Sequence, residues 1–140
     1  IPHLALNANV AVFSLFPGIQ EKVMHNFLKT KELRGIVMRT FGSGNAPKSP
    51  WLSHMLREAA ERGVVIVNIS QCVAGTVEMS RYDTGYQLKD MGVVSGYDST
   101  VEAAITKLMF LCAQFNDPHI IRNMMTMSLA GEITTPEKQQ

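Results

Sequence analysis

The sequence predicts an α/β domain built on a four-stranded parallel sheet, because short apolar runs alternate with segments of helical periodicity along its 140 residues. The third run, residues 64–69, is almost unbroken in apolar character, which is typical of a parallel strand covered on both faces. Strands separated by helices need crossover connections, and these are right-handed. We therefore expect helices on both faces of the sheet, in a three-layer α/β/α arrangement of the Rossmann-like or flavodoxin-like type.

The individual elements follow from local signals. β-Branched and aromatic residues predict strands at residues 10–15, 35–39, 64–69 and 93–95. Helical spacing of apolar residues predicts helices over 19–28, from Pro50 behind a Ser49 cap, over a short stretch at 84–90, from 101 to about 115, and after Asp117. Gly63 is expected to end the second helix, and Ser99 with Glu102 to form a capping box.

Composition excludes several classes of function. Thirteen Lys and Arg against twelve Asp and Glu leave a net charge of +1, which gives no support for nucleic-acid binding. No apolar run approaches the roughly 18 residues of a membrane-spanning helix. Two cysteines without a C-x-x-C pair and four scattered histidines predict no disulfide framework, metal or cofactor. We expect a reduced, intracellular single domain, and the first residue, Ile1 rather than Met, indicates a processed protein or a fragment.

Parallel sheets of this kind bind ligands outside the carboxyl ends of their strands. Glycine or proline mixed with polar or aromatic residues follows each predicted strand there, at residues 16–18, 40–47, 70–75 and 96–98. Arg39 ends the second strand, where an unpaired charge is costly and a carboxylate held by two hydrogen bonds is the best partner. Two partners fit: the carboxylate of a ligand, or one of the domain's own carboxylates, such as Glu58 or Asp98.

The loop after the second strand contains further candidates. Gly42 and Gly44 resemble part of a dinucleotide-binding fingerprint, but its third glycine is missing. Asn45 lies beside these glycines, where asparagine commonly stabilises a turn through its own side chain. The loop therefore gives only weak support for a nucleotide site.

Ser70 and Cys72 follow the third strand and are the candidate nucleophiles. A nucleophile needs a base within hydrogen-bonding reach, and the candidate bases His25 and His54 fall in predicted helices. We therefore expect Ser70 and Cys72 to line a ligand pocket rather than to break bonds.

Four segments together resemble the C-terminal domain of the type I (cytoplasmic) L-asparaginases. These segments are residues 15–19 (LFPGI), 38–47 (MRTFGSGNAP), 62–72 (RGVVIVNISQC) and 92–104 (GVVSGYDSTVEAA). The pattern Arg-x-x-Gly-x-Gly-Asn-x-Pro and its spacing to Asn-x-Ser-Gln-Cys are specific in combination. The resemblance extends over a core of about residues 10–133 and leaves a polar tail at 134–140.

This resemblance implies a function for the whole enzyme and for this part of it. Members of the family are amidohydrolases that convert L-asparagine and water to L-aspartate and ammonia, with catalytic threonines in an N-terminal domain that this chain lacks. The isolated chain is then expected to be inactive and to need no cofactor. The resemblance also implies a cytoplasmic homo-oligomer, dimer or tetramer, in which Asn45 reaches the active site of a neighbouring subunit. It further implies that Arg39, Ser70 and Cys72 match an allosteric asparagine site that some members of the family carry, with Ser70 where threonine is frequent.

Two other interpretations remain open. The chain fits a stand-alone module of the same fold that binds a nucleotide or a phosphosugar, for which Gly42 and Gly44 are the supporting feature. It also fits a related amidohydrolase, such as an amidotransferase subunit that forms glutaminyl-tRNA, because the substrate pocket lies mostly in the other domain.

Overall fold

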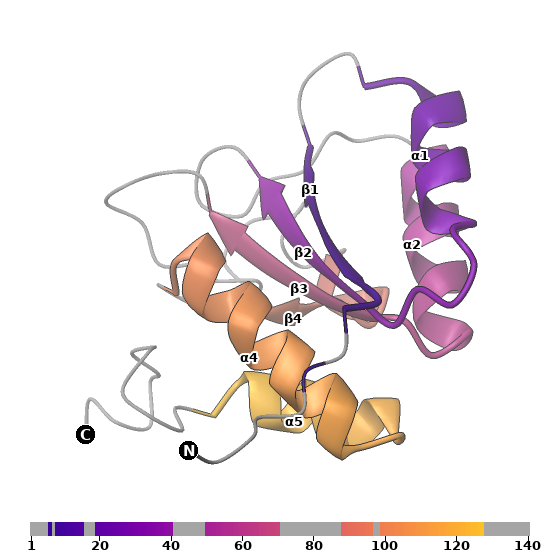
Figure 1. Cartoon of the computed structure of the whole chain (residues 1–140). Helices are drawn as coiled ribbons and strands as arrows, with labels where there is room; N and C mark the ends of the chain where they lie inside the picture. The colour runs from indigo at the N-terminus through magenta and orange to yellow at the C-terminus, as the bar shows by residue number, and fades with distance from the viewer. Residues whose placement is uncertain are drawn as a thin grey trace.

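The computed structural model describes residues 6, 8–15, 19–40, 50–70, 88–96 and 99–127, with Ser70 described by its main chain alone. Its elements are, in order, β1 (Val10–Ser14), α1 (Glu21–Leu28), β2 (Gly35–Thr40), α2 (Pro50–Glu61), β3 (Val65–Ser70), β4 (Val94–Ser95), α4 (Val101–Gln114) and α5 (Pro118–Met125). The four strands form one parallel sheet, with α1 and α2 on one face and α4 and α5 on the other (Figure 1). The predicted three-layer α/β class is therefore confirmed.

The strand order β1-β2-β3-β4 explains how the helices divide between the two faces. Right-handed crossovers between strands laid down in sequence place their helices on one face, and α1 and α2 both pack there. The chain returns over the opposite face after β4, so that α4 covers β1 and β2 and α5 covers β3 and β4. No helix in the described part of the chain is both long and apolar enough to cross a membrane.

The two central strands are buried on both faces, as their continuous apolar runs predict. Along β2, Ile36 and Met38 belong to the core beneath α1 and α2, whereas Val37 belongs to the core beneath α4 and α5. β3 alternates in the same way, with Ile66 in the first core and Val67 in the second. Because successive side chains of a strand point to opposite faces, this alternation shows which face of the sheet each residue of β2 and β3 lies on.

α4 packs directly on β2, at a position without a side chain. A Cβ atom on Gly35 would lie 2.7 Å from Cδ2 of Leu108, which is itself fully buried on α4. The fully or almost fully buried residues of α4 are Ala104, Leu108, Leu111 and Cys112. The predicted inward face included Leu108 and Cys112, but Val101, Ile105 and Phe115 are only half-buried.

The helix ends agree with the sequence in two cases and correct it in a third. Asp117 caps α5 by accepting a hydrogen bond from His119 N at 2.9 Å, and Gly63 follows α2 with a φ of +97°. The capping box expected at Ser99 is wrong by one residue, because Thr100 is the N-cap and accepts from Ala103 N at 3.1 Å. Ser49, residues 16–18 and residues 84–87 lie outside the described residues, and residues 88–90 are helical.

Candidate functional site: the carboxyl edge of the sheet

Arg39 is the last residue but one of β2 and is half-buried. Its register partners are Ser14 on β1 and Ile69 on β3, and its carbonyl oxygen accepts a hydrogen bond from Leu15 N at 2.8 Å. Alternation along β2 places Arg39 on the same face as Val37, which is the face covered by α4 and α5. Arg39 therefore lies near the carboxyl end of the sheet, on the face that α4 and α5 cover.

No hydrogen bond or ion pair joins the Arg39 side chain to another residue in the described part of the chain. The hypothesis of an ion pair with Glu58 is wrong, because Glu58 lies on α2, against the opposite face of the sheet. Glu58 Oε1 is 2.9 Å from Lys29 Nζ, and this hydrogen bond and charge lower the pKa of the Glu58 carboxyl. The other candidate partner, Asp98, lies outside the described residues.

The remaining predicted ligand-binding residues are placed only in part. Ser70 ends β3 and pairs in register with Thr40, one position beyond the pair formed by Arg39 and Ile69. The backbone thus brings Arg39 and Ser70 to the same edge on neighbouring strands, but not directly opposite each other. Outside the described residues lie Gly42, Gly44, Asn45 and Cys72.

The histidines considered as bases lie on the helices where the sequence predicts them. His25 is exposed on α1. On α2, the side chain of His54 is 79% exposed, and its Nε2 atom is 3.6 Å from Glu58 Oε2. Both helices cover the face opposite Arg39. Among the described residues, no group of three or more His, Cys, Asp or Glu is arranged to hold a metal ion.

Sequence reasoning missed a buried polar row beneath this edge. Thr40, Asn68 and Ser95 lie on β2, β3 and β4, where 0%, 0% and 8% of their surfaces are exposed. The Thr40 hydroxyl donates a hydrogen bond to Asn68 Oδ1 at 3.1 Å, and Asn68 pairs in register with Ser95. The signal that could have found this row is Asn68 itself, the polar residue in the otherwise apolar run 64–69.

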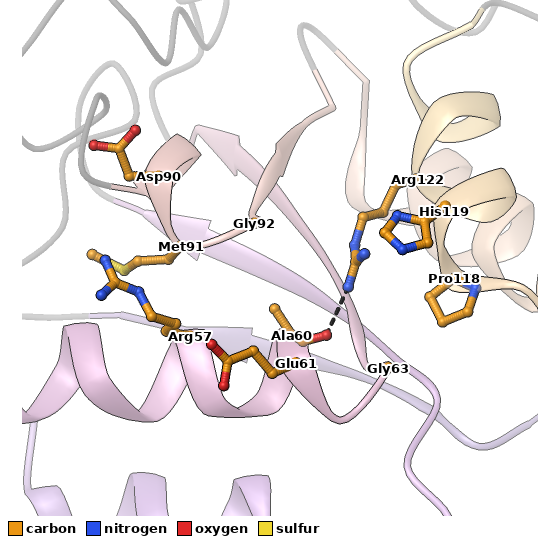
Figure 2. A pocket seen from close by; sticks show the side chains of 10 residues that line it. All are labelled: Arg57, Ala60, Glu61, Gly63, Asp90, Met91, Gly92, Pro118, His119 and Arg122. Carbon is orange, nitrogen blue, oxygen red and sulfur yellow. Dashed lines mark hydrogen bonds between the residues drawn. The ribbon is translucent and has the colours of Figure 1, made fainter.

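Two hollows that described residues line lie at the other end of the sheet. A groove of about 360 Å³ runs between the end of α2, the residues before β4 and the start of α5 (Figure 2). Arg122 reaches across it from α5 and donates to the carbonyl oxygen of Ala60 at 2.8 Å. Its charge is thereby used to stabilise the end of α2, where carbonyl groups lack partners within the helix.

Cations from other elements stabilise the ends of the other described helices in the same way. Arg62 donates to Leu28 O at the end of α1 at 2.8 Å, and Lys107 donates to carbonyl oxygens at the end of α5. Arg34 donates to Cys112 O and Phe115 O at the end of α4, the second at 2.9 Å. We assign these cations to structural roles, which leaves the carboxyl edge as the candidate site.

The fold and this edge define a class of protein: a three-layer α/β domain with a half-buried arginine at the carboxyl ends of its parallel strands. A family model for the Glutaminase/Asparaginase C-terminal domain matches residues 9–125. The chain belongs to this family. The match confirms the family inferred from the four sequence segments, and it does not favour a stand-alone nucleotide or phosphosugar module.

Individual relatives agree. The chain is 42% identical over 125 residues to L-asparaginase 1 of Escherichia coli, covering 89% of this chain and 37% of that protein. It is 38% identical to the 60 kDa lysophospholipase of Homo sapiens, covering 24% of that protein. The crystal structure of L-asparaginase I from Vibrio cholerae superposes with a TM-score of 0.84 at 43% identity, over 90% of this chain and 38% of that one. The chain thus spans less than two fifths of the length of these relatives.

Proposed function

We propose that this chain acts as the C-terminal domain of a cytoplasmic, homo-oligomeric L-asparaginase, and that its carboxyl edge binds the amino acid L-asparagine as an effector. The observation that carries the proposal is Arg39, a half-buried residue next to the end of β2 whose side chain has no hydrogen-bond or ion-pair partner in the described part of the chain. A cation in that position is costly unless a carboxylate joins it. L-Asparagine offers an α-carboxylate, which a guanidinium can hold through two parallel hydrogen bonds.

Ser70 ends the neighbouring strand β3, Cys72 lies two residues further along the chain, and both would line the same effector site. The main-chain register supports this only in bringing Ser70 to the same edge of the sheet, because it pairs Ser70 with Thr40 and not with Arg39. A hydroxyl and a thiol are small polar groups that leave room for an amino acid beside the guanidinium. Neither group is assigned a chemical step.

Bond breaking would belong to catalytic threonines outside this chain, in the complete enzyme. The domain's contribution to that active site would be Asn45, which would reach the substrate bound in a neighbouring subunit. This assignment requires an oligomer, dimer or tetramer, in which the domain also supplies subunit contacts. The relatives named as L-asparaginases, of which this chain spans less than two fifths, support such a division of labour.

The test compares two arginine variants in the complete enzyme. Arg39→Ala removes the proposed clamp, whereas Arg57→Ala removes an equal charge from the exposed surface of α2. A charge-assisted hydrogen bond contributes roughly 1.5–3 kcal/mol, so Arg39→Ala should raise the asparagine concentration for half-maximal activation by about tenfold or more. Arg57→Ala should leave it unchanged. Equal responses of the two variants would refute the effector role.

A second assay tests where the chemistry takes place. The purified chain should release no ammonia from L-asparagine under conditions in which the complete enzyme turns over. Turnover by the chain alone would show that the nucleophile lies within these 140 residues.

A further inference from the structure

The buried polar row of Thr40, Asn68 and Ser95 crosses three neighbouring strands near their carboxyl ends. All three residues lie on the face covered by α1 and α2, the opposite face from Arg39. Thr40 is the last residue of β2, and Asn68 is two residues before the end of β3. The row therefore lies close to the carboxyl edge of the sheet, where the proposed site is located.

Asn68 connects both neighbouring strands at this level. Its side-chain oxygen Oδ1 accepts from the Thr40 hydroxyl of β2 at 3.1 Å, and its main-chain oxygen accepts from Gly96 N, just after β4, at 2.9 Å. Thr40 pairs in register with Ser70, so its hydrogen bond to Asn68 runs diagonally across two residues of β3. A diagonal hydrogen bond of this kind forms in one register only, because a shift of one residue moves each side chain to the other face.

Gly96 is confined from the other face of the sheet as well. A Cβ atom there would lie 2.7 Å from Cγ2 of Ile69 and 3.1 Å from Cγ1 of Val67. The chain after β4 thus passes close over β3 while it donates to Asn68. β4 itself has only two residues in the ladder, so these contacts hold much of the strand end in place.

Stability alone does not account for a polar pair in this position. A hydrogen bond between neutral groups contributes little net stability, and an apolar pair of the same shape can replace it at almost no cost. Buried polar groups are best understood where they specify one arrangement among several. Here the arrangement that they specify is the register of β2, β3 and β4 at the carboxyl edge.

We propose that Thr40 and Asn68 are positioning residues, whose buried hydrogen bond fixes the carboxyl ends of β2, β3 and β4. Fixing these strand ends also fixes the position of Arg39 and the points at which the three strands end. Their benefit for an amino-acid ligand rests on the function proposed above. The positioning itself does not, since it concerns the main chain of the sheet.

The first test measures amide hydrogen exchange by NMR in the full chain. Thr40→Val removes the hydroxyl and keeps the shape of the side chain, whereas Thr40→Ser keeps the hydroxyl and should restore the wild-type pattern. In Thr40→Val, the Gly96 amide should exchange at least about tenfold faster, while the Val65 amide, bonded to Arg34 O at the amino ends of the strands, changes much less.

A matched control separates local loosening from a general loss of stability. Ile66→Val removes one methylene group from β3, two residues before Asn68 and on the same face of the sheet as Asn68. It should accelerate the Gly96 and Val65 amides by the same factor. If Thr40→Val does not fold, Thr40→Val/Asn68→Leu, in which both partners are apolar, takes its place. A Gly96 amide that exchanges no faster than Val65 overturns the proposal.

The second test connects the pair to ligand binding in the complete enzyme. Thr40→Val should raise the asparagine concentration for half-maximal activation, and Thr40→Ser should restore it. An unchanged response of Thr40→Val, in an enzyme whose Arg39→Ala variant has lost its response, overturns the positioning of the site. If Arg39→Ala keeps the full response, the proposed effector role fails instead, and the exchange of Gly96 alone then decides the positioning.

Discussion

The close approach of α4 to β2 gives the sharpest prediction about the packing that supports Arg39. Gly35 begins β2 and is buried, and a Cβ atom built on it would lie 2.7, 2.9 and 3.1 Å from Cδ2, Cγ and Cδ1 of Leu108. Its φ is not positive, so alanine is compatible with the backbone and the cost of Gly35→Ala comes from space alone. Leu108 is 0% exposed and cannot swing into solvent, so α4 must move away from the sheet.

The magnitude follows from the size of this overlap. Ordinary carbon contacts lie near 3.5–4.0 Å, so Leu108 and its helix must shift by about 1 Å. Inserting a methyl group into a packed core costs about 1–3 kcal/mol, which lowers the melting temperature of a domain of this size by about 4–12 °C. Thermal unfolding followed by circular dichroism measures this shift.

A double-mutant cycle shows whether the cost arises at this contact. Leu108→Ala removes all three atoms that the new methyl group would meet. In that background Gly35→Ala should cost nothing or restore stability, with a coupling energy of at least about 1 kcal/mol. An equal cost in both backgrounds, or no cost in the wild type, would refute the explanation that α4 packs on a glycine.

Three further predictions concern the helix ends and the buried thiol. Arg34→Met should lower the free energy of unfolding, measured in urea, by about 2–4 kcal/mol, because the carbonyl groups of Cys112 and Phe115 lose their cation. Arg34→Lys should recover less than half of that loss, since a single ammonium group cannot replace the two guanidinium nitrogens that bond these two carbonyl groups. Gly63→Ala should lower the melting temperature by about 4 °C or more, because φ is +97° and the new Cβ lies 3.3 Å from Cγ of Pro118; a variant as stable as the wild type would contradict that strain. Burial raises the pKa of the Cys112 thiol, so the stability that the neutral thiol contributes is present at neutral pH and is lost as the pH rises above about 8.5, the pKa of the thiol in the unfolded chain. Above that pH, the melting temperature of the wild type should fall more steeply with pH than that of Cys112→Ala, and parallel curves for the two proteins would count against this explanation.

The order and pairing of the elements could be predicted from the sequence because the signals are local and repeated. The continuous apolar run at 64–69 predicts a strand buried on both faces, and Val65 and Ile66 indeed lie in different cores. Crossover connections make the strands parallel, so their carboxyl ends lie at one edge, and this places Arg39 at that edge from the sequence alone.

What could not be predicted depends on residues that are distant in sequence. Arg34 meets carbonyl groups 78 and 81 residues later, and Arg122 meets one 62 residues earlier. Such contacts arise only once the helices are packed, so the sequence alone does not show that these arginines stabilise helix ends. The face on which Arg39 lies likewise needs the observed register, because a one-residue shift would reverse it.

The capping error at Ser99 has a similar cause. Ser99 and Glu102 match the spacing of a capping box, but Thr100 is an equally good N-cap one residue later. In the structure Ser99 N donates to Gly96 O at 3.1 Å, and α4 starts at Val101 behind the Thr100 cap. Local propensity allows both choices of cap.

The most direct measurement is a crystal structure of the complete enzyme with L-asparagine bound. We expect the α-carboxylate of an asparagine molecule to lie within hydrogen-bonding distance of the Arg39 guanidinium, with Ser70 and Cys72 beside it. An Arg39 paired with a carboxylate of its own domain, such as Asp98, and no amino acid at the carboxyl edge would contradict the account.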